Sequence, residues 1–179
     1  DADYIDSRKC IVCHPAHHDS WARTYHSRMT QQARDGSVQG DFDKNNTLEY
    51  QGIKARMERR NGSFFMTFVY PDGRVEKNVI VRTVGSRRIE QYISKQNGQH
   101  QRLPVAYDLI NRRWMHLNGS FFHPDGKDFF ELRAAWDANC VFCHNVKAQP
   151  NLDFNSKTFD TEVAELGIAC GACHGPAAV

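Results

Sequence analysis

Residues 140–144 read Cys140-Val-Phe-Cys143-His144, and the same CxxCH pattern occurs twice more in the chain. The other copies are Cys10-Ile-Val-Cys13-His14 and Cys170-Gly-Ala-Cys173-His174, so the three copies use all six cysteines. Two cysteines three positions apart lie on one side of a helical turn, from which both sulfurs reach one edge of a haem. The histidine that follows is then placed beneath the iron. The spacing is therefore typical of covalent haem attachment through two thioethers and one axial imidazole.

Other uses of six cysteines explain this pattern less well. Three disulfides would suit a secreted chain but would not require a histidine after every pair. A zinc site of two CxxC pairs would leave two cysteines over, and a thioredoxin-like redox centre needs only one CxxC. The sequence therefore predicts three covalently bound haems c. The predicted attachment points are Cys10, Cys13, Cys140, Cys143, Cys170 and Cys173, and the predicted proximal iron ligands are His14, His144 and His174.

Composition and charge argue against several other classes of protein. The chain has 179 residues, of which 40% are hydrophobic and 25% charged, and its formal net charge is +2. This balance gives no basis for nucleic-acid binding, which calls for a basic surface. No run of about 18 apolar residues is present, so no transmembrane segment is expected. Because cytochrome c maturation takes place outside the cytoplasm, we expect a periplasmic or extracellular protein whose signal peptide has been removed.

The long cysteine-free stretch between the first and second motifs indicates antiparallel β-structure. Apolar residues alternate with charged ones over 53–58, and Asn61-Gly62 is typical of a hairpin turn. Residues 63–70 are rich in aromatic and β-branched side chains. A turn at Pro71-Asp72-Gly73 then precedes another run of β-branched residues at 75–83.

Helices are predicted on both flanks of this β-rich stretch, within residues 15–33 and 160–169. The expected fold class is α+β, with short helices and loops packed around three c-type haems and with an inserted antiparallel β-meander. We expect one trihaem cytochrome c domain over residues 1–179. Its predicted parts are a haem 1 segment at 1–40, a β-rich insertion at 41–118, and a haem 2 and haem 3 segment at 119–179.

Six histidines remain as candidates for the distal iron positions: His17, His18, His26, His100, His116 and His123. His26 lies in an aromatic-rich stretch, His116 follows a Trp-Met pair, and His123 stands between Phe and Pro. An imidazole in an apolar wall beside haem seldom stays unused, so these three are the predicted distal ligands. His17, His18 and His100 have polar sequence neighbours and are expected to be solvated, unless one of them ligates a haem in a neighbouring molecule. Met29 is an alternative ligand, although packing against haem is the expected role.

Several stretches beyond the motifs resemble known multihaem cytochromes. The chain resembles those related to the tetrahaem cytochrome of hydroxylamine oxidation, and more closely the haem-bearing N-terminal region of multihaem cytochromes that continue into tetratricopeptide repeats. The matching stretches are Cys10-xx-Cys13-His14-Pro15, Trp21-xxx-Tyr25-His26-xx-Met29, Gly40-Asp41-Phe42, residues 103–108, Arg113-Trp114-Met115-His116-Leu117, residues 136–144, and Cys170-xx-Cys173-His174-Gly175-Pro176. The resemblance implies axial ligation by His26, His116 and His123. The chain departs from the shared pattern at His17, His18 and His100, and in stopping five residues after His174.

These observations favour electron transfer over catalysis. Three haems that each have two histidine ligands exchange electrons without binding substrate, so we expect a carrier or conduit in an extracytoplasmic respiratory chain. Its expected partners are other redox proteins and, in one variant, further copies of itself in a head-to-tail filament. The alternative is a haem enzyme that converts a small nitrogen compound at an iron with an open coordination position. A haem-based sensor would require a signalling region, which the sequence does not display.

Overall fold

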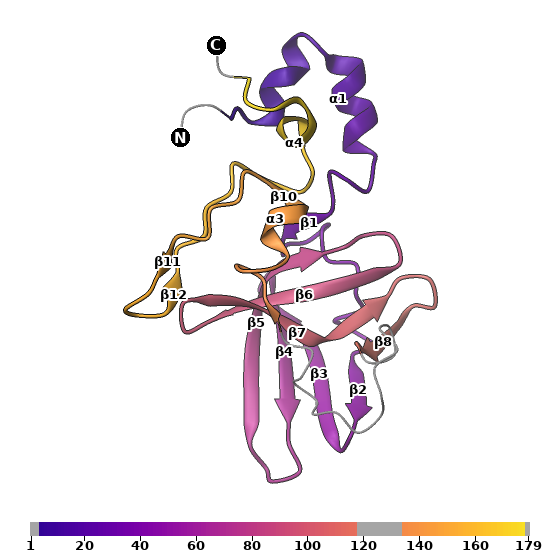
Figure 1. The fold of residues 1–179 in the computed structure, drawn as a ribbon. Coiled ribbons are helices and arrows are strands. Elements are labelled where there is room, and N and C mark those ends of the chain that lie inside the picture. Colours follow the sequence, from indigo (N-terminus) through magenta and orange to yellow (C-terminus); the bar gives the residue numbers. More distant parts are fainter. Residues whose placement is uncertain (1–3, 118–133, 178–179) are drawn as a thin grey trace.

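The computed structural model describes residues 4–117 and 134–177, and an antiparallel nine-stranded sheet forms the main body of this part of the chain (Figure 1). Seven strands are neighbours in chain order: β2 Thr47–Tyr50, β3 Ile53–Arg60, β4 Ser63–Val69, β5 Val75–Val84, β6 Ile89–Gln96, β7 Gln99–Asp108 and β8 Arg113–His116. Two short strands lie off this path: β1 Thr30–Gln32 pairs with β5, and β9 Ala134–Ala135 pairs with β7.

The sheet curls until the two ends of its main path meet. Tyr50 of β2 and His116 of β8 stack with their ring centroids 4.2 Å apart and their planes 3° from parallel. Register shifts between β5 and β6 and between β6 and β7 mark bulges, which bend strands and increase their twist. The result is a nearly closed, barrel-like sheet.

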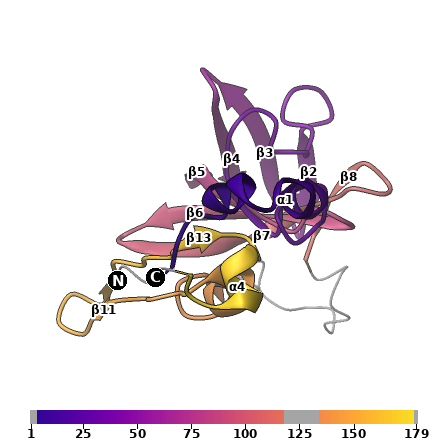
Figure 2. The same ribbon diagram turned by 90° about the horizontal axis from the view of Figure 1, so that it is seen from above.

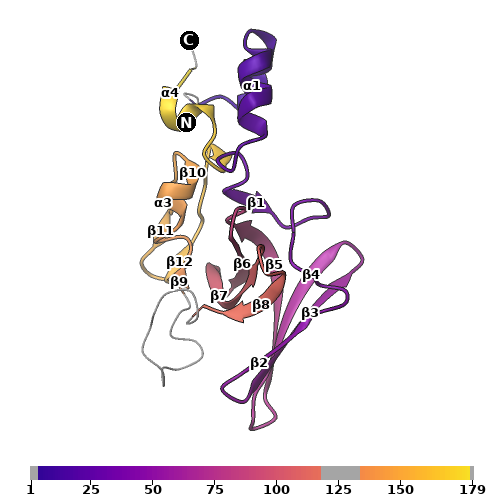
Figure 3. The same ribbon diagram turned by 90° about the vertical axis from the view of Figure 1, so that its right-hand side faces the viewer.

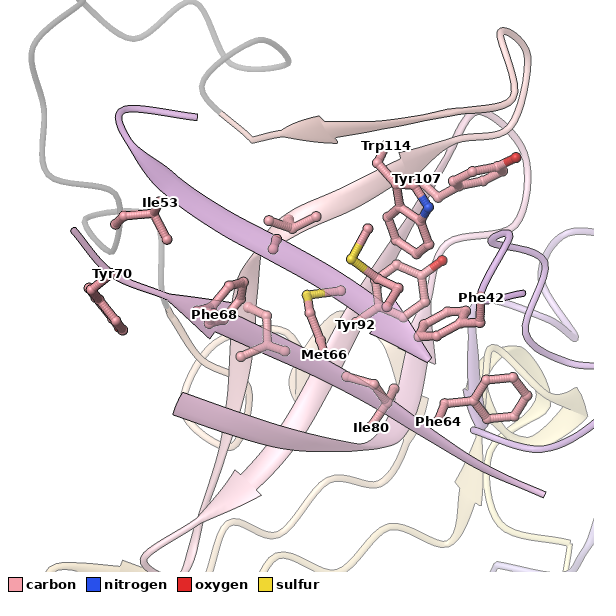
Figure 4. Close-up of a cluster of buried hydrophobic side chains, with 14 residues drawn as sticks. Phe42, Ile53, Phe64, Met66, Phe68, Tyr70, Ile80, Tyr92, Tyr107 and Trp114 are labelled. Atoms are coloured by element: carbon pink, nitrogen blue, oxygen red, sulfur yellow. The ribbon is translucent and has the colours of Figure 1, made fainter. Parts of the chain in front are cut away.

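The barrel interior is a continuous apolar core (Figure 4). Buried residues alternate with more exposed ones along β3 and β4, as a strand with one face inward requires. Met57, Met66 and Phe68 are completely buried. Phe42, from the loop before β2, meets Trp114 edge to face with the ring centroids 5.2 Å apart. These side chains pack against one another inside the sheet.

A buried carboxylate fastens the loop before β2 to the barrel. Glu90 is fully buried and accepts hydrogen bonds from the Tyr92 hydroxyl at 2.5 Å and from the backbone N–H groups of Gln39 and Gly40 at 3.0 and 2.9 Å. A Cβ at Gly40 would overlap both Tyr92 and Trp114, so only glycine fits there. Burial raises the pKa of Glu90 to about 7, although these hydrogen bonds favour the ionised form.

Short elements gather at one end of the sheet together with both ends of the chain (Figures 1 and 2). They are η1 Ser7–Val12, α1 Pro15–Ala22, α3 Val141–His144, β10 Asn145–Val146, β11 Leu152–Asp153, β12 Thr158–Phe159, β13 Glu165–Leu166 and α4 Cys170–His174. β10 pairs with β13, and β11 pairs with β12. Figure 3 shows α1 and α4 beyond one end of the barrel, with α3 between α4 and the sheet. Each CxxCH motif therefore lies in a short helical segment outside the barrel.

The predicted fold class is wrong. The structure is mostly β, and its sheet is the main body rather than an insertion among haem-binding helices. The apolar residues of 53–107 pack mainly against one another inside the barrel. The individual strand predictions across 53–83 are confirmed by β3, β4 and β5.

Of the two flanking helix predictions, only the first part of 15–33 is confirmed, by α1. α1 ends at Ala22, and beyond it the side chains of Thr24 and Ser27 donate hydrogen bonds to backbone carbonyls, which competes with helical pairing. Residues 160–169 are extended instead of helical, because β13 pairs with β10 and Gly167 adopts a φ of 81°. In both places tertiary pairing outweighs local helix propensity. Within the described ranges, no helix is long and apolar enough to cross a membrane.

The buried carboxyl of Glu90 predicts a pH-dependent stability. Its folded pKa of about 7 lies above the ordinary glutamate value of 4.5, so its contribution to the stability of the fold is present below pH 4.5 and is lost as pH rises through 7. The difference corresponds to about 3 kcal/mol of unfolding free energy. We expect Glu90→Gln to remove this loss between about pH 5 and pH 8 in urea unfolding of the holoprotein. Glu49→Gln, which alters an exposed carboxyl on β2, should leave the pH dependence unchanged.

Candidate haem-binding site

The fold brings the first and third motifs to one cavity, although they lie at opposite ends of the sequence. A cavity of about 670 Å³ is lined by Cys10 and His14 of the first motif and by Cys170, Cys173 and His174 of the third. The thiols of Cys10 and Cys170 are near enough to interact. The pKa of Cys10 is raised mainly by burial and secondly by its interaction with the Cys170 thiol. The volume lies within the range typical of small-molecule and cofactor sites.

A partly buried hydrogen-bond bridge holds the two motifs together. Glu165 in β13 accepts hydrogen bonds from the backbone N–H of Ser7 at 3.0 Å and from its hydroxyl at 2.8 Å. The Ser7 hydroxyl oxygen in turn accepts the backbone N–H of Cys170 at 3.2 Å. Ser7 begins the turn that carries the first motif, and Cys170 begins the helix of the third. One serine therefore links both attachment sites to a single carboxylate.

A second contact places His26 beside the third motif. The backbone N–H of Ile168 donates to the carbonyl of His26 at 2.9 Å, and the indole N–H of Trp21 donates to the carbonyl of Ile168 at 2.9 Å. Gly167 approaches so closely that a Cβ there would stand 2.9 Å from the carbonyl oxygen of Ser27. His26 follows the first motif in sequence, yet the structure packs it against the strand that enters the third.

The cavity contains the donor atoms that c-type haems require. Five histidines line it: His14, His17, His18, His26 and His174. The Nε2 atom of His18 is buried without a hydrogen-bond partner among the described residues, and its ring meets Trp21 at 5.2 Å. An unpaired buried nitrogen is costly, and an iron ligand position would satisfy it. The donor set therefore fits haem. His18 is only partly exposed, in contrast to the solvated side chain that we expected, whereas His17 lines the same cavity but is exposed, as expected.

The second motif forms a separate site nearer the barrel. Cys140 packs against an apolar cluster that includes Trp136, Val141 and Val84, while Cys143 is exposed. Burial raises the pKa of Cys140 and lowers that of His144, whose Nδ1 is buried without a partner in the described structure. Burial thus favours the neutral imidazole that iron ligation needs.

Arg82 was not singled out from the sequence, because it stands alone in a strand pattern. Its guanidinium lies 4.1 Å from the Trp136 ring, and its Nη1 is buried without a partner in the described structure. It lines a polar cavity of about 850 Å³ between β1 and residues 161–166, together with Arg8, Arg34 and Lys147. Arginine pairs well with carboxylates, and haem propionates are carboxylates. The same cavity is also lined by Asp6, Glu162 and Glu165, and Arg8 forms an ion pair with Asp6, so the wall carries charges of both signs.

The two other predicted distal ligands are His116 and His123. His116 is 4% exposed and lies in the barrel seam against Tyr50, not in the cavity of the first and third motifs. His123 lies outside the described residues. Their roles as ligands stay predictions. All six cysteines are free thiols, which is at odds with the disulfide alternative.

No cluster of three or more histidine, cysteine, aspartate or glutamate side chains suited to a bare metal ion occurs within 4–117 and 134–177. A haem iron differs in this respect, since the porphyrin supplies most of its ligands and the protein adds one or two. The helical CxxCH turns are therefore the metal-related feature that the structure offers.

Comparison with known proteins identifies a relative by fold only. No family model and no curated protein matches the chain. The chain is similar to the crystal structure of the outer cell wall cytochrome OcwA, with a TM-score of 0.58 and 17% sequence identity over 97% of this chain. The match spans 32% of that protein, so this chain corresponds to about a third of its length. The likeness shows that the fold occurs in a cytochrome, and it does not identify the specific family that the sequence resembles.

The tight packing at Gly167 predicts a sensitive point in the cavity wall. Gly167→Ala should destabilise the holoprotein by about 1 to 3 kcal/mol, because the new Cβ meets the backbone of Ser27 and the positive φ is unfavourable. Gly36→Ala is the matched control, since Gly36 has a similar φ of 87° but open space around it. Urea unfolding followed by circular dichroism measures both. Equal losses in the two variants would show that the contact with Ser27 adds nothing.

Proposed function

We propose that this chain is an electron-transfer domain that carries three covalently attached haems c. The observation that carries the proposal is the shared cavity of the first and third motifs, where free thiols and histidines from opposite ends of the sequence converge. A purely structural role for these residues would not require the same CxxCH turn three times. The fold likeness to an outer cell wall cytochrome supports the proposal.

Different residues would bind different parts of each haem. The cysteine pairs would form thioethers, and His14, His144 and His174 would supply the proximal imidazoles. His26 and His18 line the cavity and are available for distal positions. When bound, haem supplies a one-electron iron couple. A distal histidine on each iron would leave no open position, and for that reason electron transfer is favoured over chemistry on a substrate.

The arrangement of the thiols indicates where electrons would enter and leave. Cys13, Cys143 and Cys173 are exposed, so the attached haem edges would lie near the protein surface, within reach of a docked redox partner. Two haems in one cavity would also be close enough for rapid exchange between them. We propose an extracytoplasmic location, other redox proteins as partners, and a head-to-tail assembly of copies as a possible extension of the same conduit.

The first test of this function is the number of haems. Intact mass of the denatured protein should equal the chain plus three haem masses, because each motif supplies two thioethers. The Cys140→Ala/Cys143→Ala variant should carry two haems and retain the cavity pair. A bare chain mass, or a chain with disulfides, would overturn the proposal.

Carbon monoxide separates electron transfer from the enzyme alternative. It binds reduced haem iron that has an open or weakly held position, so the reduced holoprotein should give no carbon monoxide difference spectrum. A stoichiometric signal from one haem per chain would instead favour an enzyme acting on a small nitrogen compound. Heat-denatured holoprotein, in which distal ligands are lost, serves as the positive control.

A further inference from the structure

His100 lies in a setting that its sequence neighbours do not reveal. The sequence predicts a solvated side chain, but His100 is only 7% exposed. It sits near the start of β7, where its carbonyl accepts the backbone N–H of Trp136 at 2.7 Å. Its ring meets the indole of Trp136 edge to face, with the ring centroids 5.6 Å apart. The expectation of solvation is therefore wrong.

A fully buried carboxylate fixes the orientation of this imidazole. Asp137 is inaccessible to solvent, and its Oδ1 lies 2.9 Å from Nδ1 of His100. Its Oδ2 accepts the backbone N–H of the same histidine at 2.6 Å, and the hydroxyl of Thr161 donates to Oδ1 at 2.6 Å. Burial alone would raise the pKa of Asp137, but the hydrogen bonds from His100 and Thr161 outweigh it and lower that pKa.

This geometry selects one tautomer of His100. An ionised carboxylate accepts a hydrogen bond from the Nδ1–H group, so the lone pair of a neutral ring is on Nε2. Among the described residues, no hydrogen bond reaches Nε2. Histidines that ligate metals commonly donate their other ring N–H to a carboxylate in this way, which fixes the ring and raises its basicity.

His100 contacts the turn that carries the second motif. The carbonyl of Trp136 accepts the backbone N–H groups of Asn139 and Val141, which folds residues 136–141 into the segment that presents Cys140. Cys140 packs against the apolar cluster that includes Trp136. Arg102 lies two residues beyond His100 on β7, hence on the same strand face, and interacts electrostatically with Cys140.

We propose that His100 is an axial ligand of the haem attached at Cys140 and Cys143, with Asp137 as the positioning residue that sets its tautomer. The inference rests on the haem attachment proposed above. It gives a role to a histidine that lies outside the family pattern, and it supplies a ligand next to the motif. His116, by contrast, is stacked in the barrel seam.

The test compares two replacements of His100 in the oxidised holoprotein. The His100→Asn variant keeps a side-chain N–H for Asp137 but has no iron ligand, whereas His100→Ala removes both. We expect one haem of three to change from low-spin to high-spin in each variant by electron paramagnetic resonance, and to bind carbon monoxide when reduced. Added imidazole should restore the low-spin signal in His100→Ala. Thr161→Val, which removes the hydrogen bond from the Thr161 hydroxyl to Asp137, should keep all three haems low-spin.

Intact mass separates the two proposals that this test involves. Three haem masses in the wild type and in both variants show that attachment is intact, so a spin change then reports ligation. A His100→Asn protein with three attached, fully low-spin haems would overturn the assignment and leave His100 with the structural role of holding Trp136 and Asp137 against β7. A high-spin haem in His123→Ala alongside unchanged His100 variants would also overturn it. Fewer than three haems in the wild type would instead refute the haem attachment itself.

Discussion

The carboxylate of Glu165 joins the two ends of this chain, and the candidate haem cavity depends on that junction. It accepts two hydrogen bonds from Ser7, whose hydroxyl oxygen accepts the N–H of Cys170 across 163 positions of sequence. The nearby hydrogen bond from Ile168 to His26 is a second link between the segments that carry the first and third motifs. Without these contacts the first and third motifs would be helical turns on separate segments. With these contacts, thiols and imidazoles of both motifs line the same cavity.

The barrel provides a rigid base for this arrangement without taking part in it. Its core of aromatic and aliphatic side chains is complete in itself, and its seam is closed by the stacked rings of Tyr50 and His116. A small cytochrome often relies on haem for much of its buried apolar surface, and we expected the same here. Instead, the sheet anchors β1 on one side and the turn at residues 136–141 on another. The motifs thus project from the barrel-like sheet.

The outcome of the strand and helix predictions follows from where the stabilising contacts lie. Alternation along β3 and β4 and the Asn61-Gly62 turn are local signals, and the structure contains both strands. Residues 160–169 have good helix formers, but their actual partners are β10 and the backbone of His26, which are distant in sequence. Pairing with those partners requires extended backbone at β13 and a left-handed glycine at 167. No property of the decapeptide alone indicates that requirement.

The proposed haem attachment follows from the sequence alone. Two cysteines and a histidine at fixed spacing occupy a single turn, so their geometry is set by covalent connection and needs no distant contact. Which residues lie next to each motif depends on the tertiary structure. Asp137 meets His100 from 37 positions away, and Cys170 lies beside Cys10 from the other end of the chain. A polar sequence context therefore concealed a buried, carboxylate-bound histidine, since burial depends on which strands and turns pack together and that is settled by the closed sheet.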